Sequence, residues 1–168
     1  MDIRLEKAAP RDAAILLEYL KQVGGETDNL TFGPEGMPFS VEAEAEFICS
    51  MENSTDNIML LAKCNNKIVG CASLNRLPRR MKHRGDFAIS VAKDYWNKGI
   101  GSKLLENIIA FARENSFEIV DLQVRSGNKS AIHLYEKYEF KKIGEHPAFF
   151  RINDENISFD IMCLELNE

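Results

Sequence analysis

Hydrophobic and polar positions along the chain follow two different periods, and the changes between them divide the chain into segments. Alternating or continuous apolar runs predict strands over 3–8, 57–63, 67–77, 81–92, 118–124, 140–143 and 157–166. Apolar residues at helical spacing predict helices over 10–23, 40–51, 99–114 and 126–138. The order of these elements, β-α-α-β-β-β-α-β-α-β-β, predicts an α/β fold with a mixed sheet.

Residues with special backbone or capping properties mark several element boundaries. Gly24 and Gly25 are expected to end the first helix, because glycine adopts the conformation found just past a helix terminus. Ser40 is a good N-cap for the second helix, and Glu42 and Glu44 lie in its first turn, near the positive end of the helix dipole. The apolar face of that helix is expected to consist of Phe47, Ile48 and Met51. A loop is expected over 26–39, and a loop or hairpin over 144–156.

The stretch from 85 to 114 combines a strand, a glycine-bearing turn and a long amphipathic helix. Gly99 and Gly101 lack a Cβ, so the backbone can turn tightly there and a ligand can come close. The first N–H groups of the helix have no intrahelical partner, and they carry the positive end of its dipole. Such a turn is a binding site for a phosphate or pyrophosphate group. Lys98 and Lys103 add positive charge beside it.

The turn by itself leaves other interpretations open. A tight connection without any ligand would use the same glycines. The turn is not a phosphate loop of the nucleotide-hydrolase kind, because no Gly-Lys-Ser/Thr follows at the required spacing. A dinucleotide-binding turn would need a third glycine where Leu104 stands, although Asp121 lies at about the distance expected of a ribose-binding acid. Asp121 falls inside a predicted strand instead of at its end, which weakens this second reading.

Composition limits the class of protein. A chain of 168 residues predicts a single domain spanning 1–168. The net charge of -5 argues against a nucleic-acid partner, which would require a basic face. The N-terminus does not resemble a signal peptide, and no apolar run approaches the roughly 20 residues that cross a bilayer. We therefore expect a cytoplasmic protein that does not bind a membrane.

The cysteines do not predict a metal site or a disulfide framework. The chain has four, and none forms a Cys-x-x-Cys pair, while its three histidines are scattered. A structural zinc site is therefore not expected. The cysteines lie in or beside apolar runs, which predicts buried free thiols in a reducing compartment. They are Cys49, Cys64, Cys71 and Cys163.

Two segments resemble the Gcn5-related N-acetyltransferase (GNAT) family. Residues 96–101, Trp-Asn-Lys-Gly-Ile-Gly, are similar to the family's acetyl-CoA-binding segment, Gln/Arg-x-x-Gly-x-Gly/Ala. Residues 128–140 resemble its Asn-x-x-Ala-x-x-x-Tyr-x-x-x-Gly-Phe segment. The chain departs from these patterns at Trp96, where Gln or Arg is usual, and at Glu139, where Gly is usual. The resemblance implies the acyl-CoA N-acyltransferase (GNAT) fold, a central mixed twisted sheet flanked by helices on both faces.

The resemblance also implies which residues hold acetyl-CoA. The N–H groups from Asn97 to Ser102 would bind the diphosphate. The strand before the turn would separate from its neighbour and offer backbone groups to the pantetheine arm, although plain sheet pairing would use the same groups. Asn128 would hydrogen-bond the arm, and it is equally suited to be a helix N-cap. The implied contacts are Ile89, Ser90, Val91, Trp96, Asn97, Lys98, Gly99, Ile100, Gly101, Ser102, Asn128 and Tyr135.

The implied reaction joins an acetyl thioester to an amine. Tyr135 matches the family's general acid, and a phenol with a pKa near 10 is protonated at neutral pH. The alternative is an aromatic ring on the apolar face of a helix. Asp86 is the candidate general base, with His83 nearby, although a lone acid on a strand commonly faces solvent. No metal is needed.

The acceptor site in this family is built from the loop after the first helix and from the last hairpin. Here these correspond to 30–39 and 147–152, which carry the aromatic residues Phe32, Phe39, Phe149 and Phe150. These rings would line an acceptor channel or pack against the rest of the protein. The acceptor would be the amine of a small molecule, such as a polyamine or an aminoglycoside-like compound, or a protein N-terminus.

The function expected from the resemblance is acetyl-CoA-dependent N-acetyl transfer to a primary amine. The departures at Trp96 and Glu139 keep open a catalytically inactive module that binds or senses acyl-CoA. A nucleotide-cofactor enzyme of Rossmann type is a third alternative. The resemblance also makes a homodimer an expectation.

Overall fold

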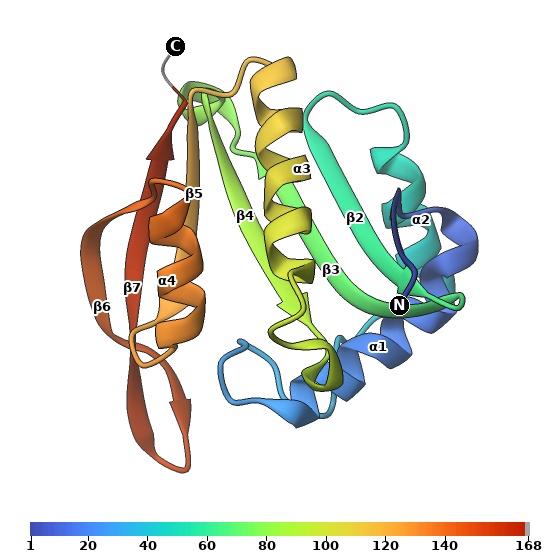
Figure 1. The fold of residues 1–168 in the computed structure, drawn as a ribbon, viewed down its shortest axis with the longest axis horizontal. Helices are drawn as coiled ribbons and strands as arrows, with labels where there is room; N and C mark the ends of the chain where they lie inside the picture. The colour runs from blue at the N-terminus through green and yellow to red at the C-terminus, as the bar shows by residue number, and fades with distance from the viewer. Residues whose placement is uncertain (167–168) are drawn as a thin grey trace.

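The computed structural model describes residues 1–166 and contains the predicted elements in the predicted order, arranged in three layers (Figure 1). The central layer is a seven-stranded sheet with the order β1-β2-β3-β4-β5-β7-β6. The strands are β1 (Ile3–Lys7), β2 (Asn57–Cys64), β3 (Lys67–Arg76), β4 (Arg84–Val91), β5 (Ile119–Arg125), β6 (Lys141–Ile152) and β7 (Glu155–Glu165). The helices are α1 (Ala13–Glu26), α2 (Val41–Met51), α3 (Ile100–Glu114) and α4 (Lys129–Lys137).

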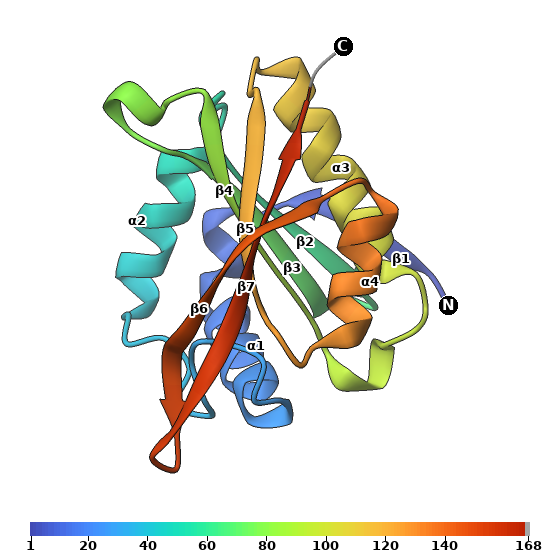
Figure 2. The same ribbon diagram turned by 90° about the vertical axis from the view of Figure 1, so that its left-hand side faces the viewer.

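The helices cover both faces of the sheet (Figure 2). On one face, α3 buries Leu104, Leu105 and Ile108 against the strands. On the other face, α1 and α2 bury a second cluster that includes Leu16 and Ile48. The mixed sheet with helices on both faces confirms the predicted fold class. The packing of α3 also fixes the position of its N-terminus beside the end of β4.

The sheet is interrupted at its centre. β4 and β5 run parallel and pair over only three positions, from Arg84 with Ile119 to Asp86 with Asp121. Beyond Asp86, β4 continues along β3 as far as Val91, while β5 continues along β7. Figure 1 shows the two strands close together at one end and diverging toward the other. One edge of β4 is therefore open in the middle of the sheet.

Two predicted boundaries were wrong for reasons that involve distant residues. α1 continues through Gly24 and Gly25 to Glu26. A Cβ on Gly24 would lie 2.1 Å from the carbonyl oxygen of Gly33, so this glycine permits a close approach of the following loop instead of ending the helix. The strand predicted over 140–143 extends to Ile152, because it pairs with β7. The segment 144–156, predicted as a loop or hairpin, belongs to this hairpin, which turns at Asn153 and Asp154.

Two expectations about exposure also fail in part. Cys49 is exposed on α2, whereas Cys64 is buried as expected, and all four cysteines are free. Phe47 is 49% exposed instead of lying within the apolar core of α2. Among residues 1–166, no helix combines the length and the apolar composition that a membrane crossing requires.

Candidate active site

A cavity of about 760 Å³ lies where β4 and β5 separate. Residues from both faces of the sheet line it, so the opening connects the side of α4 with the side of α1 and α2. Of the residues expected to bind acetyl-CoA or to take part in catalysis, five line this cavity. They are Asp86, Ile89, Ser90, Asn128 and Tyr135.

The backbone of β4 presents hydrogen-bonding groups to the opening. The Ala92 N–H donates to the Val69 carbonyl of β3 at 2.9 Å. Alternate residues of a strand direct their backbone N–H and C=O groups to opposite sides. The backbone groups of Ser90 therefore point toward β3, and those of Ile89 and Val91 point toward the opening. The Val91 carbonyl accepts a hydrogen bond from the indole Nε1 of Trp96 at 2.8 Å. Trp96 thus fixes the end of β4.

Ser90 contributes through its side chain. Its hydroxyl lies 2.9 Å from the phenol oxygen of Tyr19 on α1. Burial raises the pKa of Tyr19, and the hydrogen bond to Ser90 opposes this effect only in part. The pair ties α1 to the open segment of β4.

The turn between β4 and α3 has the geometry expected of an anion site. Asn97 and Gly99 have positive φ angles of 60° and 80°. Gly99 caps α3, and its carbonyl accepts the N–H of Lys103 at 3.1 Å. Within residues 1–166, the N–H groups from Asn97 to Ser102 have no hydrogen-bond acceptor. They form a row of free donors at the positive end of the α3 dipole. Residues 96–102 lie outside the cavity, on the connection that follows β4.

Tyr135 packs against aromatic neighbours. Its ring centroid lies 6.2 Å from that of Phe87 in an edge-to-face arrangement and 5.7 Å from that of Phe140. Its hydroxyl has no hydrogen-bond partner among the described residues. Every fully buried side-chain polar atom of residues 1–166 has a partner, so this hydroxyl retains access to the cavity. Burial raises the pKa of Tyr135, which keeps the phenol protonated.

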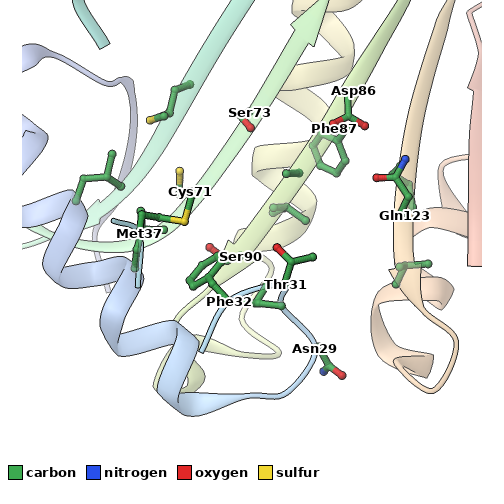
Figure 3. A pocket seen from close by; sticks show the side chains of 18 of the residues that line it. Asn29, Thr31, Phe32, Met37, Cys71, Ser73, Asp86, Phe87, Ser90 and Gln123 are labelled. Carbon is green, nitrogen blue, oxygen red and sulfur yellow. The ribbon is translucent and has the colours of Figure 1, made fainter. Parts of the chain in front are cut away.

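Asp86 lies at the last paired position before the strands diverge. Burial raises the pKa of Asp86, and the charge of Asp121 adds to this effect, whereas Gln123 and Arg84 oppose it. Asp121 itself accepts a hydrogen bond from Arg84 at 2.7 Å. Figure 3 shows Asp86 and Gln123 on either side of the opening. Asp86 is thus a carboxylate with a raised proton affinity facing the cavity, as a general base requires.

Asn128 has the capping role that the sequence allowed. Its side-chain oxygen accepts the Ala131 N–H at 3.3 Å and begins α4. Asn128 also lines the cavity, and the amide nitrogen of its side chain makes no hydrogen bond within the described residues. The cap therefore leaves a donor available to a ligand.

The expected acceptor segments contribute most of the apolar wall on the side of α1 and α2. Figure 3 shows Thr31, Phe32 and Met37 of the segment after α1 beside this part of the cavity. Phe149 of β6 also lines it and stacks on Phe159 with a centroid distance of 4.3 Å. Phe150 packs against the same Phe159 ring at 4.9 Å and does not line the cavity.

Several cavity residues had no functional assignment from the sequence. Among them are Glu44, Cys71, Ser73 and Gln123. Glu44 was expected only as a first-turn acid of α2. It precedes Ile48 by four positions and Met51 by seven, which places it on the buried face of that helix. This spacing was the one signal in the sequence that an acid would face inward.

The comparisons with known proteins agree on one family. The model of the acetyltransferase (GNAT) family matches residues 26–140. An N-alpha-acetyltransferase, RimI, of Mycobacterium tuberculosis is 31% identical over 60% of this chain. The match covers 62% of that relative's length.

Solved structures match over nearly the whole chain. A GNAT-family acetyltransferase of Streptococcus pneumoniae has a TM-score of 0.94 and 32% sequence identity, and the match covers 99% of this chain and 100% of that one. The yncA protein of Salmonella typhimurium, a putative acetyltransferase solved with acetyl-CoA, has a TM-score of 0.85 over 100% of this chain and 96% of that one. At 18% identity, this second similarity concerns the fold alone.

Proposed function

Because the chain belongs to the acetyltransferase (GNAT) family, we propose that it transfers an acetyl group directly from acetyl-CoA to a primary amine of a small molecule or protein. The observation that carries this proposal is the divergence of β4 and β5. It leaves free backbone groups, a protonated phenol and a carboxylate around one cavity.

The residues present fit a CoA thioester. The free N–H groups from Asn97 to Ser102 would bind its diphosphate, and Lys98 adds a positive charge. The open edge of β4 at Ile89 and Val91 would pair with the amide groups of the pantetheine arm, as an added strand would. Asn128 would donate to the same arm from the other side of the opening. In this scheme the Trp96 side chain does not contact the diphosphate, and its indole N–H donates a hydrogen bond to the Val91 carbonyl.

The chemistry follows from the positions of Tyr135 and Asp86. A neutral amine attacks the thioester carbonyl, a C–N bond forms, and the C–S bond breaks. Asp86 accepts the proton that the amine nitrogen must lose, directly or through a water. Tyr135 donates a proton to the departing sulfur, because a phenol with a raised pKa remains protonated at neutral pH. Both products then leave uncharged at the reacting atoms.

Thermal unfolding in the presence of acetyl-CoA, CoA, NAD and ATP tests this proposal. A ligand at a hundred times its Kd stabilises a protein by about 2.7 kcal/mol. For a chain of this size, the midpoint would rise by about 5–11 °C with acetyl-CoA and CoA only. Acetylation of any amine in a panel would then establish turnover. The absence of a shift with acetyl-CoA and CoA at millimolar concentration would contradict the proposal.

A further inference from the structure

Glu44 is a buried acid without a partner. It is 5% exposed, and its carboxylate makes no hydrogen bond or ion pair with any residue of the described part of the chain. Every fully buried side-chain polar atom in residues 1–166 has a partner, so the Glu44 carboxylate keeps contact with the cavity that it lines. A carboxylate so enclosed has lost most of its water and gained no cation in return.

The other buried acids show that this arrangement is unusual in the molecule. Asp12 contacts Lys63 at 2.8 Å, and Asp121 contacts Arg84 at 2.7 Å. Asp160 is 3.2 Å from Lys142. These acids, with Glu44, are the buried carboxylates of the described residues, and each except Glu44 faces a cation. Burial accordingly raises the pKa of Glu44, since no cation of the described residues contacts its carboxylate.

Glu44 lies away from the atoms that react. Its charge acts on Cys71, whose pKa burial and Glu44 together raise to about 12. Cys71 pairs with Ser90 across β3 and β4, whereas the Tyr135 ring packs on Phe87. Three residues of a strand separate these two levels, a distance of about 10 Å. Glu44 therefore meets a part of the acceptor other than the nitrogen that becomes acetylated.

We propose that Glu44 binds a second, positively charged group of the acceptor, so that the acceptor is an amine with a further cationic centre. On the side of α1 and α2, from which Glu44 comes, the cavity wall is largely apolar and includes Leu16, Leu20 and Met59. Such a wall suits the hydrocarbon segment that joins the two nitrogens. This inference rests on the proposed acetyl transfer, and it specifies the class of acceptor.

Wild-type protein provides the first test. Linear alkane diamines of increasing length are compared as acceptors with the alkylamines of the same lengths. A charge-assisted hydrogen bond in a desolvated site predicts that kcat/KM for the best diamine exceeds that of its matched alkylamine by about 10-fold to 100-fold. The preference should also show an optimum in chain length, set by the separation of the two sites. Equal rates for diamines and alkylamines at every length would overturn the proposal.

Glu44→Gln provides the second test, because it removes the charge and keeps the shape of the side chain. The variant should lose the preference for diamines through KM, while its kcat/KM for the alkylamines changes less than about twofold. Glu42→Gln and Glu46→Gln remove the same charge from exposed positions of α2 and should keep the preference. A preference that persists in Glu44→Gln contradicts the assignment.

Binding measured without turnover separates the two proposals. If wild-type protein is stabilised by acetyl-CoA but acetylates no amine, acetyl transfer is contradicted. Stabilisation by a diamine, and its loss in Glu44→Gln, then still reports whether Glu44 binds a cation. If alkylamines are acetylated and diamines are not preferred, acetyl transfer stands and the cation site is wrong.

Discussion

Replacing Tyr135 with phenylalanine removes one oxygen from the centre of the proposed site and little else. The ring contacts with Phe87 and Phe140 do not involve the hydroxyl. The hydroxyl has no hydrogen-bond partner among residues 1–166, so its removal leaves no group unpaired. We therefore expect the free energy of unfolding to change by less than about 0.5 kcal/mol, or about 1–2 °C in the midpoint.

The expected effect on catalysis is much larger. Proton donation by a positioned side chain contributes about 100-fold to 10,000-fold to a reaction rate. In the proposed mechanism Tyr135 would donate to the departing sulfur only as the C–S bond breaks, so kcat should fall by this factor while KM for acetyl-CoA changes less than about twofold. The raised pKa of Tyr135 sets the sign of the pH dependence. The proposed acid would act when protonated, so we expect it to cause no loss of wild-type activity below about pH 10.

Release of CoA with a saturating amine acceptor, followed with a thiol reagent, measures these quantities. Tyr138→Phe is a matched control, since it removes a phenol oxygen near the end of the same helix, where that oxygen contacts Glu106 at 2.5 Å. It should leave kcat nearly unchanged. A Tyr135→Phe enzyme with a kcat within about threefold of wild type would refute the role of the phenol as acid, because even a modest general acid contributes about 100-fold.

Three further predictions concern other parts of the protein. Asp86→Asn should lower kcat by about 100-fold or more. In a pH–rate profile, wild-type activity should rise as the pH passes the raised pKa of Asp86, and this rise should be absent in Asp86→Asn. Gly99→Ala should lower the free energy of unfolding by about 1–2 kcal/mol, measured with urea, and weaken acetyl-CoA binding, because φ is 80° at Gly99. Gly127→Ala should have neither effect, because Gly127 has no positive φ and a Cβ there would meet no neighbour. Asp12→Asn leaves Lys63 with a single carboxylate partner and should cost about 1.5–3 kcal/mol near pH 7 in the same assay.

The lowered pKa of Asp12 predicts that the effect of Asp12→Asn on the free energy of unfolding depends on pH. Burial opposes ionisation of Asp12, but hydrogen bonds from Lys63 and from the Ala9 N–H outweigh it, and the pKa of Asp12 is lowered. The stability that Asp12 contributes is therefore complete above its unfolded pKa near 4 and is lost as the pH falls through the lower folded value. Asp12→Asn should lack this loss. A difference between the two proteins that is as large at pH 2 as at pH 7 would contradict this account.

The order of elements followed from the sequence because each element has a local period or cap. Ser40 accepts the Ala43 N–H at 3.1 Å, and Asn128 caps α4, as the residue types predicted. Gly99 has the positive φ that its place in the turn required. These features depend on neighbours along the chain, and a sequence contains that information.

The features that were missed depend on residues far apart in the chain. From the sequence, Gly24 was expected to end the first helix, but in the structure it lies inside α1 and allows the backbone of Gly33 to approach closely. Glu44 looks like a dipole partner until its helix is known to turn that face toward the cavity. The separation of β4 from β5 was expected only from the resemblance, because an unpaired strand edge has no local pattern of its own. Similarly, no pattern in the sequence predicted that Trp96 would bond the Val91 carbonyl.

The short pairing of β4 with β5 also has a mechanical consequence. Three paired positions join the half of the sheet that contains β1 to β4 with the half that contains β5 to β7. A ligand arm lying between the diverging strands would complete the missing hydrogen bonds and connect the two halves of the sheet. The two halves of the protein would then be stiffest with a ligand in place and most compliant without one. The hydrogen bonds that would bind a ligand arm between β4 and β5 would thus also make the whole sheet more rigid.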